Sequence, residues 1–386
     1  MRFVQTADLH LDACFASPGF PADYGNRRRQ SLRDVFRAVA TRAAQWPADA
    51  LLIPGDLFDL ERVSRDTVAF LRATFEAIHP VPVVIAPGNH DPFTGESPYA
   101  TEAWPDNVLI FSEPVWSAFV LGEGRLVVHG FAFDGYEISS NPFGTLEIPQ
   151  DDALHVAVAH GTERAHQPPD GKSYAPFDAA EAAVPGLAYL ALGHFHRVTE
   201  PEGDHPTRMC YSGAPEAHDF GQTGPRHHLE VEIENGEVRL TPVPSARVVY
   251  ATHDVDCREM ATSQELVDAI RGRASEGDVP QIARITLRGP CEPSILGELP
   301  AVYDAVASEF EYLQLVDETE PAEDYDELAR ETTSLGAFIA RMNEEVADAP
   351  DERRRALLER AREAGLAAYR GQKLGIRGLD IEGGAA

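Results

Sequence analysis

Five short apolar stretches in this sequence each end in a side chain that can bind a metal ion. They cover residues 2–7, 50–54, 81–85, 154–159 and 187–192. Stretches of this length and composition predict β-strands, and the glycine and proline residues near their ends predict tight turns. The groups that follow the stretches are Asp8-Leu9-His10, Gly55-Asp56, Gly88-Asn89-His90-Asp91, His160-Gly161 and Gly193-His194-Phe195-His196. Open sheets place ligand sites beyond the carboxyl ends of their strands, so we expect these groups to gather at one edge.

Helical patterns separate the first three strands. Apolar residues recur at helical spacing over residues 26–45 and again over residues 64–79. Strands that alternate with helices predict an α/β sheet. Further on, a hairpin is predicted around residues 122–124, and another around Glu234-Asn235-Gly236-Glu237. Residues 1–245 therefore predict one α/β domain, a two-sheet sandwich flanked by helices.

The remainder of the chain has a different pattern. Pro242-Val243-Pro244-Ser245 marks a boundary, after which residues 246–320 predict a compact α+β unit with strands near 247–255, 282–287 and 312–316. A linker is predicted over residues 318–324, followed by one helix over about 325–347 and another that begins after Pro350 and ends near Gly371. The first of these helices carries apolar residues from Leu335 to Val346 at helical spacing. We expect residues 321–386 to form a separate helical segment.

The composition indicates the cell compartment and the class of binding partner that we expect for this protein. No apolar run approaches the length of a membrane span, and the first residues lead straight into a strand, so we expect no secretory signal. The four cysteines are far apart and form no Cys-x-x-Cys pair, which disfavours a disulfide framework or a zinc ribbon and favours the cytoplasm. The net charge of -30 is unlike that of a typical non-specific nucleic-acid binder.

The strand ends supply carboxylates, imidazoles and an amide, but no thiolate. The seven candidate ligands are Asp8, His10, Asp56, Asn89, His160, His194 and His196. A single histidine of this kind is more often structural, but seven such groups are too many for one ion and suit two ions that share a carboxylate. Two ions roughly 3.5–4 Å apart can clamp the attacking and leaving oxygens of a phosphoryl displacement, with water as the nucleophile. Mixed carboxylate and imidazole ligands favour Mn²⁺ or Fe²⁺ and leave Zn²⁺ open.

These motifs resemble those of the calcineurin-like metallophosphoesterases. The resemblance is carried by Asp8-x-His10, Gly55-Asp56-x-x-Asp59, Gly88-Asn89-His90-Asp91, His160 and Gly193-His194-x-His196. Residues 6–12, 174–177, 190–194, 211–215 and 220–225 are similar, more narrowly, to the SbcD-type DNA repair exonucleases. The motifs lie within residues 1–245. Beyond residue 245 only the layout is similar, namely a small capping domain followed by helices that bind an ATPase.

The resemblance implies a role for each candidate residue. The resemblance implies two divalent ions, which are expected to be Mn²⁺. One ion would be held by Asp8, His10, Asp56 and His196, and the other by Asp56, Asn89, His160 and His194. His90 would stabilise the transition state or protonate the leaving oxygen, with Asp59 orienting it. The implied substrate is DNA. The implied partner is an SbcC-type, SMC-like coiled-coil ATPase bound by the C-terminal helices, with a homodimer as a further assembly.

Alternatives to a DNA nuclease stay open. A phosphodiesterase or phosphatase acting on small nucleotides or other phosphoesters would use the same metal core, and the acidic charge favours it. A non-enzymatic scaffold is disfavoured by the complete ligand set. Neither exonuclease nor endonuclease action is indicated by the sequence.

Several other polar residues have a structural interpretation. Asp12 and Asp91 are predicted to stabilise turns, and His218, His227 and His228 are predicted to lie at the surface. Arg27-Arg28-Arg29 begins a helix, where positive charge is unfavourable. Two interpretations of these arginines stay open, a contact with phosphate and a solvent-exposed face of the helix. The apolar residues from Leu335 to Val346 would pack on the chain's own core or on a partner helix.

Overall fold

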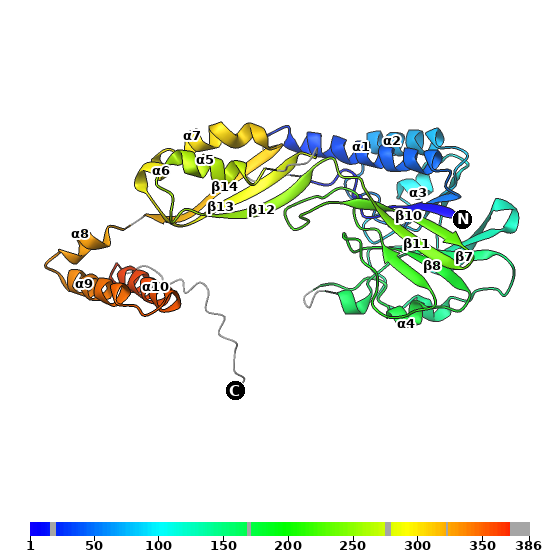
Figure 1. Ribbon diagram of the computed structural model, residues 1–386. Coiled ribbons are helices and arrows are strands. Elements are labelled where there is room, and N and C mark those ends of the chain that lie inside the picture. The colour runs from blue at the N-terminus through cyan, green and yellow to red at the C-terminus, as the bar shows by residue number, and fades with distance from the viewer. Residues whose placement is uncertain (16–20, 168–170, 275–278, 322, 371–386) are drawn as a thin grey trace. The chain divides into compact units, whose positions relative to one another are not determined.

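The computed structural model describes residues 1–15, 21–167, 171–274, 279–321 and 323–370 (Figure 1). It divides into two compact units. The first comprises residues 1–255, 267–286 and 303–316, and the second comprises residues 256–266, 287–302 and those from 317 onward. Among the described residues, no helix is long and apolar enough to cross a membrane.

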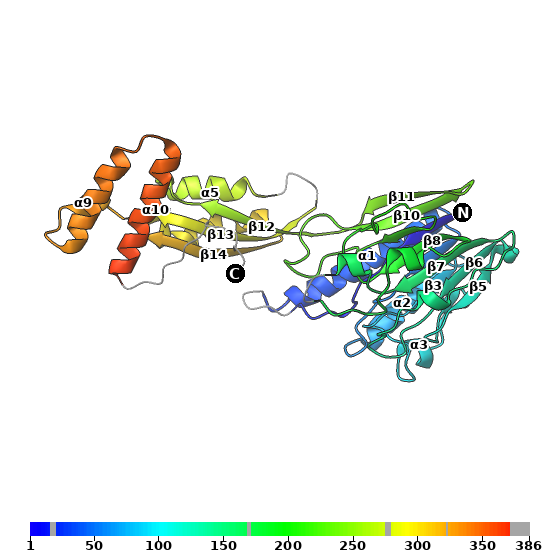
Figure 2. The same cartoon turned by 90° about the horizontal axis from the view of Figure 1, so that it is seen from below.

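A six-stranded sheet forms one half of the first unit, with the order β11-β10-β1-β2-β3-β4. Four of its strands are parallel, β1 (Arg2–Gln5), β2 (Ala50–Ile53), β3 (Val83–Ile85) and β4 (Val108–Ile110). The strands β10 (His227–Glu234) and β11 (Glu237–Pro244) form the predicted antiparallel hairpin and lie side by side in Figure 2. The helices α1 (Tyr24–Gln45) and α2 (Arg65–Ala77) cover one face, where Leu32 and Phe36 pack with Val4 and Leu51 (Figure 1).

A five-stranded sheet forms the other half, with the order β5-β6-β7-β8-β9. The strands are β5 (Ser117–Leu121), β6 (Leu126–Gly130), β7 (Leu154–His160), β8 (Leu187–Gly193) and β9 (Arg208–Tyr211), and all but β5 run parallel. Phe3 and Leu52 of the first sheet share one buried cluster with Val156 and Tyr189 of the second. Short helical segments, η2 (Phe143–Thr145) and α4 (Ala179–Ala182), pack on the outer face. The predicted α/β two-sheet sandwich is therefore confirmed.

The connections in the first unit are short. They include α3 (Pro98–Thr101), η1 (Gly122–Gly124) and η3 (Arg164–His166).

A three-stranded sheet follows the sandwich in the chain, with the order β12-β13-β14. Its elements are β12 (Val249–Asp256), α5 (Ser263–Arg271), β13 (Gln281–Cys291), α6 (Pro293–Gly297), α7 (Leu299–Val306), η4 (Ala307–Glu309) and β14 (Tyr312–Pro321).

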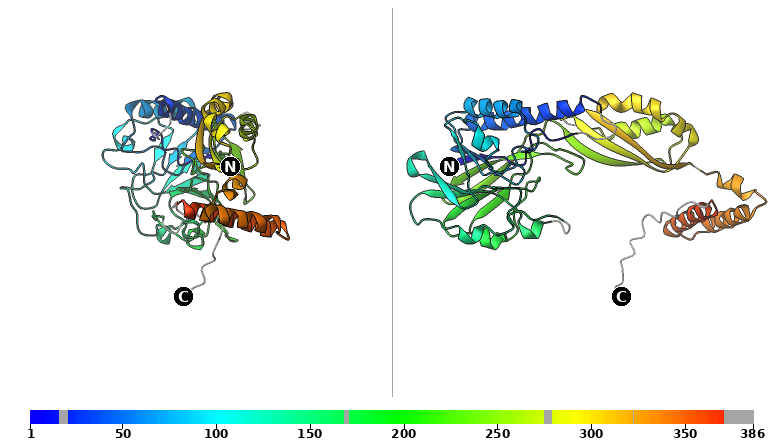
Figure 3. Two further views of the ribbon diagram at one scale, coloured as in Figure 1. Left: turned by 90° about the vertical axis from the view of Figure 1, so that its left-hand side faces the viewer. Right: turned by 180° about the vertical axis from the view of Figure 1, so that it is seen from behind.

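The C-terminal helices differ from the prediction in one respect. The helix predicted over residues 325–347 is two helices, α8 (Tyr325–Ala329) and α9 (Ser334–Ala347). The break occurs because the side chain of Thr333 accepts a hydrogen bond from the N–H of Gly336 and starts a new helix. The final helix, α10 (Glu352–Tyr369), lies beside α9 (Figure 3). Its predicted end near Gly371 falls outside the described residues, and the predicted linker begins as strand, because β14 continues to Pro321.

Arg28 lies in the interior, contrary to both interpretations of the arginine run. Its Nη1 donates to Oε1 of Glu216 at 2.6 Å and its Nη2 donates to the carbonyl of Ala217 at 3.0 Å, and the side chains of Arg28 and Glu216 are both buried.

Arg28→Met should lower the free energy of unfolding by about 3–5 kcal/mol, because Glu216 is left as an unpaired buried charge. Urea titration measures this loss. Arg27→Met, which breaks an exposed pair with Glu311, should cost at most about 1 kcal/mol, and equal losses for the two variants would contradict the assignment.

His228 makes stability sensitive to acid. Its side chain is buried in β10, and neither ring nitrogen has a hydrogen-bond partner among the described residues. Burial lowers the pKa of His228 to about 4. Between pH 6.5 and pH 4, the unfolded chain therefore binds a proton at this histidine and the folded chain does not. The free energy of unfolding falls as the pH falls through this window.

The corresponding prediction uses His228→Phe, which removes the titrating group. The variant should gain up to about 3 kcal/mol over the parent at pH 4 and unfold at a lower pH, because one pKa unit corresponds to about 1.4 kcal/mol. Circular dichroism during acid titration measures the midpoint. His79→Phe, at a side chain that is 47% exposed, is the control and should not move it. An unchanged midpoint in His228→Phe would show that this histidine does not limit acid stability.

Candidate metal centre

The loops that follow β1, β2 and β3 are hydrogen-bonded to one another. The N–H of Asp8 donates to the carbonyl of Gly55 at 3.2 Å, and the N–H of His10 donates to the carbonyl of Asp56 at 2.9 Å. Gly88 permits the close approach of the third loop, because a Cβ atom at this position would lie 2.4 Å from Oδ1 of Asp56. The sequence therefore brings the ends of separate strands into van der Waals contact.

The backbone is strained where the candidate ligands leave their strands. The φ angles of Asp8, His10, Asp56 and His194 are 54°, 44°, 53° and 121°. Side-chain-bearing residues avoid this left-handed region, at a cost on the order of 1–3 kcal/mol each. Such strain persists only where the surrounding structure enforces it, and here it turns the side chains toward a common centre.

All seven predicted ligands lie in this one cluster. Three overlapping groups have ligand atoms within 4.8 Å of one another, Asp8 with His10 and His196, Asp8 with Asp56 and His160, and Asp56 with His10 and His90. Oδ1 of Asn89 lies 2.9 Å from Nε2 of His160. The ring of His194 lies 5.3 Å from that of His160, and the backbone N–H of His194 donates to the carboxylate of Asp8. Oδ2 of Asp56 is near both Nε2 of His10, at 3.6 Å, and Nε2 of His160, at 3.5 Å.

The protonation pattern fits divalent cations. Nδ1 of His10 lies 2.8 Å from Oδ1 of Asp59, and Nδ1 of His160 lies 3.1 Å from the carbonyl of Pro54. Each Nδ1–H can donate to its acceptor, which leaves a lone pair on Nε2 of the neutral ring. Nε2 of His10 is buried and has no hydrogen-bond partner among the described residues, and Nε2 of His160 faces the oxygen of Asn89. Lone pairs that face one another repel unless a cation lies between them.

The electrostatics of the cluster indicate the same occupant. Burial and the charge of Asp56 hold the pKa of Asp8 well above its usual range. Burial raises the pKa of Asp56, but the nearby imidazoles of His160, His10 and His90, together with the hydrogen bond from the N–H of His90, outweigh it and lower the pKa of that carboxyl to about 2. Burial lowers the pKa of His194 to about 3 and that of His196 well below its usual range. The rings of His194 and His196 are therefore neutral donors, and a cation would relieve the repulsion between the carboxylates of Asp8 and Asp56.

The comparison with known families shows which protein family this chain belongs to. Residues 1–198 match the model of the calcineurin-like phosphoesterases. The chain belongs to the calcineurin-like phosphoesterase family. It is therefore a metal-dependent phosphoesterase of a family that binds two divalent metal ions, and the cluster above contains groups of side chains that could hold an ion.

Three relatives of this phosphoesterase show what it is similar to. It is 27% identical to the uncharacterized metallophosphoesterase YhaO of Bacillus subtilis, over 84% of this chain and 79% of the relative. It is 26% identical to one of the subunits of the nuclease SbcCD of Bacillus subtilis, over 58% of this chain and 64% of the relative. It is 28% identical to the DNA double-strand break repair protein Mre11 of Haloferax volcanii, over 75% of this chain and 62% of the relative. The match thus covers less than two thirds of each of the latter two proteins.

Asp91 and Asp12 stabilise turns in this phosphoesterase, as predicted. The buried carboxylate of Asp91 accepts hydrogen bonds from the N–H groups of Gly88, Asp56 and Leu57 and from the hydroxyl of Tyr99. Asp12 accepts from the N–H of Ser64 and the hydroxyl of Thr67. Neither carboxylate belongs to the groups of side chains that could hold an ion among the described residues.

The prediction of a surface position is wrong for His218, and also for His228, which is buried. The ring of His218 packs edge-on against that of His10, with centroids 5.4 Å apart, and lies 5.9 Å from that of His196. Gln222, four residues later, places its amide 2.8 Å from Nδ1 of His196. A signal was present in the sequence, because both residues fall in or beside the stretch that resembles the SbcD-type exonucleases.

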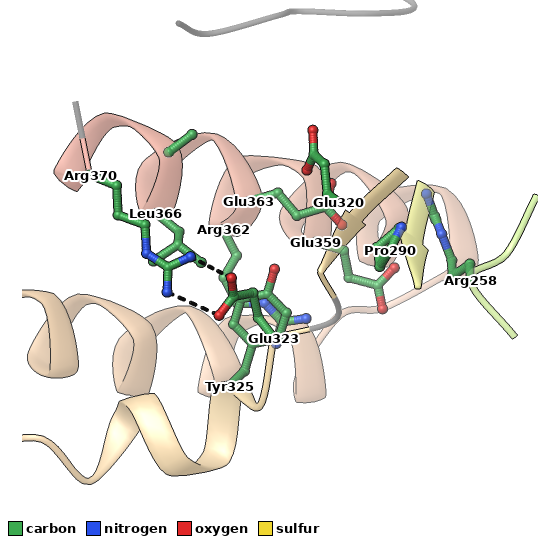
Figure 4. Close-up of a pocket in the computed structure, with 11 residues that line it drawn as sticks. Arg258, Pro290, Glu320, Glu323, Tyr325, Glu359, Arg362, Glu363, Leu366 and Arg370 are labelled. Atoms are coloured by element: carbon green, nitrogen blue, oxygen red, sulfur yellow. Dashed lines mark hydrogen bonds and ion pairs between the residues drawn. The ribbon is translucent and has the colours of Figure 1, made fainter. Parts of the chain in front are cut away.

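A separate cavity of about 520 Å³ lies within the second unit, and Figure 4 shows its lining. Arg370 on α10 forms an ion pair with Glu323, and the guanidinium of Arg362 stacks on the ring of Tyr325 at 3.7 Å. This cavity supplies no group to the metal centre.

Proposed function

We propose that this phosphoesterase is a dinuclear-metal-dependent DNA nuclease of the SbcD type, which acts as the nuclease component of a DNA repair complex. The observation that carries the proposal is the convergence of seven side chains with oxygen or nitrogen donors, Asp56 among them, beside the half-exposed ring of His90. DNA is favoured as the substrate by the similarity to a component of a nuclease and to a DNA double-strand break repair protein.

The proposed ligand sets are the two that the family resemblance implies, and the closeness of their side chains supports them. One ion would be held by Asp8, His10, Asp56 and His196, and the other by Asp56, Asn89, His160 and His194. The donor set favours Mn²⁺, with Fe²⁺ and Zn²⁺ as alternatives. When bound, two such ions stabilise negative charge on a phosphoryl group and activate water.

His90 is the proposed proton donor. Its side chain is 52% exposed, and its Nδ1 lies 3.5 Å from Oδ1 of Asp59. The bond to Asp59 is the largest cause that raises the pKa of His90, which reaches about 9. The ring is therefore protonated at neutral pH and can give a proton to the oxygen that leaves the phosphorus. Asp59 also accepts from Nδ1 of His10, so one carboxylate orients both rings.

A phosphodiesterase acting on small nucleotides is the second candidate, and the net charge of -30 favours it because that charge repels a DNA backbone at long range. The two candidates are separated by titrating Mn²⁺ into assays of linear duplex DNA, single-stranded DNA and bis(4-nitrophenyl) phosphate. A nuclease should cleave DNA at micromolar strand concentrations and the small ester only weakly. Hydrolysis of the small ester without cleavage of either DNA would contradict the nuclease assignment.

The C-terminal helices are the proposed binding site for an SbcC-type coiled-coil ATPase. The apolar residues of α9 are mostly covered by the chain itself, since Ile339 is buried and a Cβ atom on Gly365 of α10 would lie 2.1 Å from the Phe338 ring. Leu357 and Tyr369 of α10 are instead 53% and 52% exposed. These two side chains are therefore the apolar groups that α10 offers to a partner helix.

We expect Leu357→Glu with Tyr369→Glu to weaken binding of such an ATPase at least tenfold, because buried charge is costly at a helix–helix contact. Hydrolysis of the small phosphodiester should stay at the parent level. Val115→Glu with Val120→Glu is the matched control, since these side chains are 63% and 65% exposed near and on β5. Co-purification measures the complex, and unaltered binding by the α10 variant would place the interface elsewhere.

A further inference from the structure

We propose that a cavity beside the metal centre binds a phosphate of the substrate that neighbours the one to be cleaved, and that Arg226 and Arg197 recognise this phosphate. The inference rests on the proposed nuclease function, which it deepens, because a substrate with a neighbouring phosphate is a polynucleotide. It starts from the side chain of Arg226, which is buried and has two nitrogen atoms with no hydrogen-bond partner among the described residues.

The cavity lies in the first unit and has a volume of about 230 Å³. Pockets for drug-sized ligands usually measure about 300–1,000 Å³, so this cavity suits one phosphate group better than a whole nucleotide. His196 is both a lining residue and a proposed metal ligand, so a group in the cavity lies close to a group at the ions. The other polar lining residues are Arg197, Ser212, Thr223, Arg226 and His227, and no carboxylate is among the described residues of the lining.

The guanidinium of Arg226 has most of its hydrogen-bonding capacity unused. Arg226 comes directly before β10 and is only 3% exposed. Its Nη1 donates to the carbonyl of His196 at 2.6 Å, whereas its buried Nε and Nη2 have no partner among the described residues. Nε and Nη2 share one edge of the planar group, and such an edge matches two oxygens of a phosphate. Buried donors are almost always paired in proteins, so this edge is suited to an acceptor from outside the chain.

The charge of this guanidinium is also poorly compensated within the chain. Burial and the like charge of Arg197 lower the pKa of Arg226 to about 10, although Asp219 acts in the opposite direction. Arg226 therefore keeps its charge at neutral pH, in a place where water screens it weakly. A buried charge without a close counter-ion is costly, and an anion in the cavity would lower this cost. Arg197 is exposed, so a phosphate of the substrate can reach it directly.

Arg226→Gln should lower kcat/KM for a DNA oligonucleotide about 10–100-fold more than kcat/KM for bis(4-nitrophenyl) phosphate, which has a single phosphate. Losing a contact with a charged group has an effect of this size, and it should fall on KM, because the neighbouring phosphate does not change during the reaction. Arg197→Gln removes an exposed partner and should lower the same ratio about 2–5-fold. Arg239→Gln is the matched control, since it removes the same charge from a side chain of β11 that is 77% exposed, and it should keep the parent ratio.

Salt dependence separates a phosphate contact from a purely structural role of Arg226. Loss of one phosphate contact should make the logarithm of kcat/KM for the oligonucleotide fall less steeply with the logarithm of the salt concentration, with a slope that is shallower by about 0.7–0.9. A variant that only misplaces the main chain of His196 should instead lose Mn²⁺ affinity and hydrolysis of both substrates, with the slope of the parent.

The measurements are initial rates at saturating Mn²⁺ between about 50 mM and 200 mM potassium chloride. The oligonucleotide is used in the single- or double-stranded form that the parent cleaves faster, and Mn²⁺ titration and thermal unfolding accompany each variant. Equal losses on both substrates, or the parent slope, in folded Arg226→Gln would overturn the phosphate subsite alone. If Arg226→Gln does not fold, the parent ratio and slope in Arg197→Gln would overturn it. A parent chain that hydrolyses the small ester but neither form of DNA would overturn the proposed nuclease function as well.

Discussion

Asp56→Asn should release both divalent ions and lower phosphoester hydrolysis at least about 100-fold. The reason is that one oxygen of this carboxylate faces the two rings that the proposed sites separately contain, His10 at 3.6 Å and His160 at 3.5 Å. Substituting a group that merely orients a ligand costs about 10–100-fold, so the loss of a shared ligand should exceed this. The other oxygen accepts the N–H of His90, so the loop that carries the proton donor is also loosened.

The effect of Asp56→Asn is measured by equilibrium dialysis against Mn²⁺ together with initial rates. Asp106→Asn removes a carboxylate that is 88% exposed, and it is the control expected to keep both ions and the parent rate. His160→Asn, by contrast, should lose one ion and keep the other. Two bound ions per chain in folded Asp56→Asn would disprove that Asp56 bridges the sites.

His90→Asn should keep both ions and lose about 10²–10⁴-fold in turnover, which is the range contributed by a positioned proton donor. The raised pKa of His90 also gives the parent an alkaline limb, because turnover falls once this ring loses its proton. The pKa is about 9 in the ion-free protein, and nearby cations oppose the carboxylates that raise it, so the limb lies at or below pH 9. The variant should lack that limb.

Asp59→Asn provides the matched test of the same group. Its carboxylate is the largest cause of the raised pKa of His90, so removing it should move the alkaline limb to lower pH. The rates of both variants are best measured from pH 6 to pH 10 on the small phosphodiester, whose binding needs few contacts. Turnover of His90→Asn within a few-fold of the parent would show that this ring only stabilises the loop.

The side chains of the candidate metal centre can be picked out of the sequence because each of them is a local signal. Each ligand follows an apolar strand directly, and parallel strands in one sheet bring their carboxyl ends together whatever the rest of the chain does. The place of Asp56 beside His10 follows from the neighbouring strands β1 and β2 and from glycines that let the loops touch. Its place beside His160, which follows β7 of the other sheet, depends in addition on how the two sheets pack together.

Other features depend on contacts that the sequence does not display. His218 reaches the carbonyl of Leu9 across more than half of the chain, and the loop that carries it has no hydrophobic periodicity that could reveal its burial. Arg28 has a charged side chain in a run of arginines, and only the tertiary structure supplies Glu216 as its partner. Thr333 interrupts a helical pattern because its hydroxyl caps a new helix. The spacing of apolar residues alone cannot show that this cap is favoured over a continuous helix.

The central claim is that this phosphoesterase holds two divalent ions at Asp56 and uses them to cleave DNA. The most direct test is to count Mn²⁺ bound to the purified chain while measuring cleavage of linear duplex DNA at each Mn²⁺ concentration. The account predicts two ions per chain, with cleavage rising as the second ion binds and disappearing with chelator. Binding of a single ion at full activity, or cleavage that persists in chelator, would contradict it.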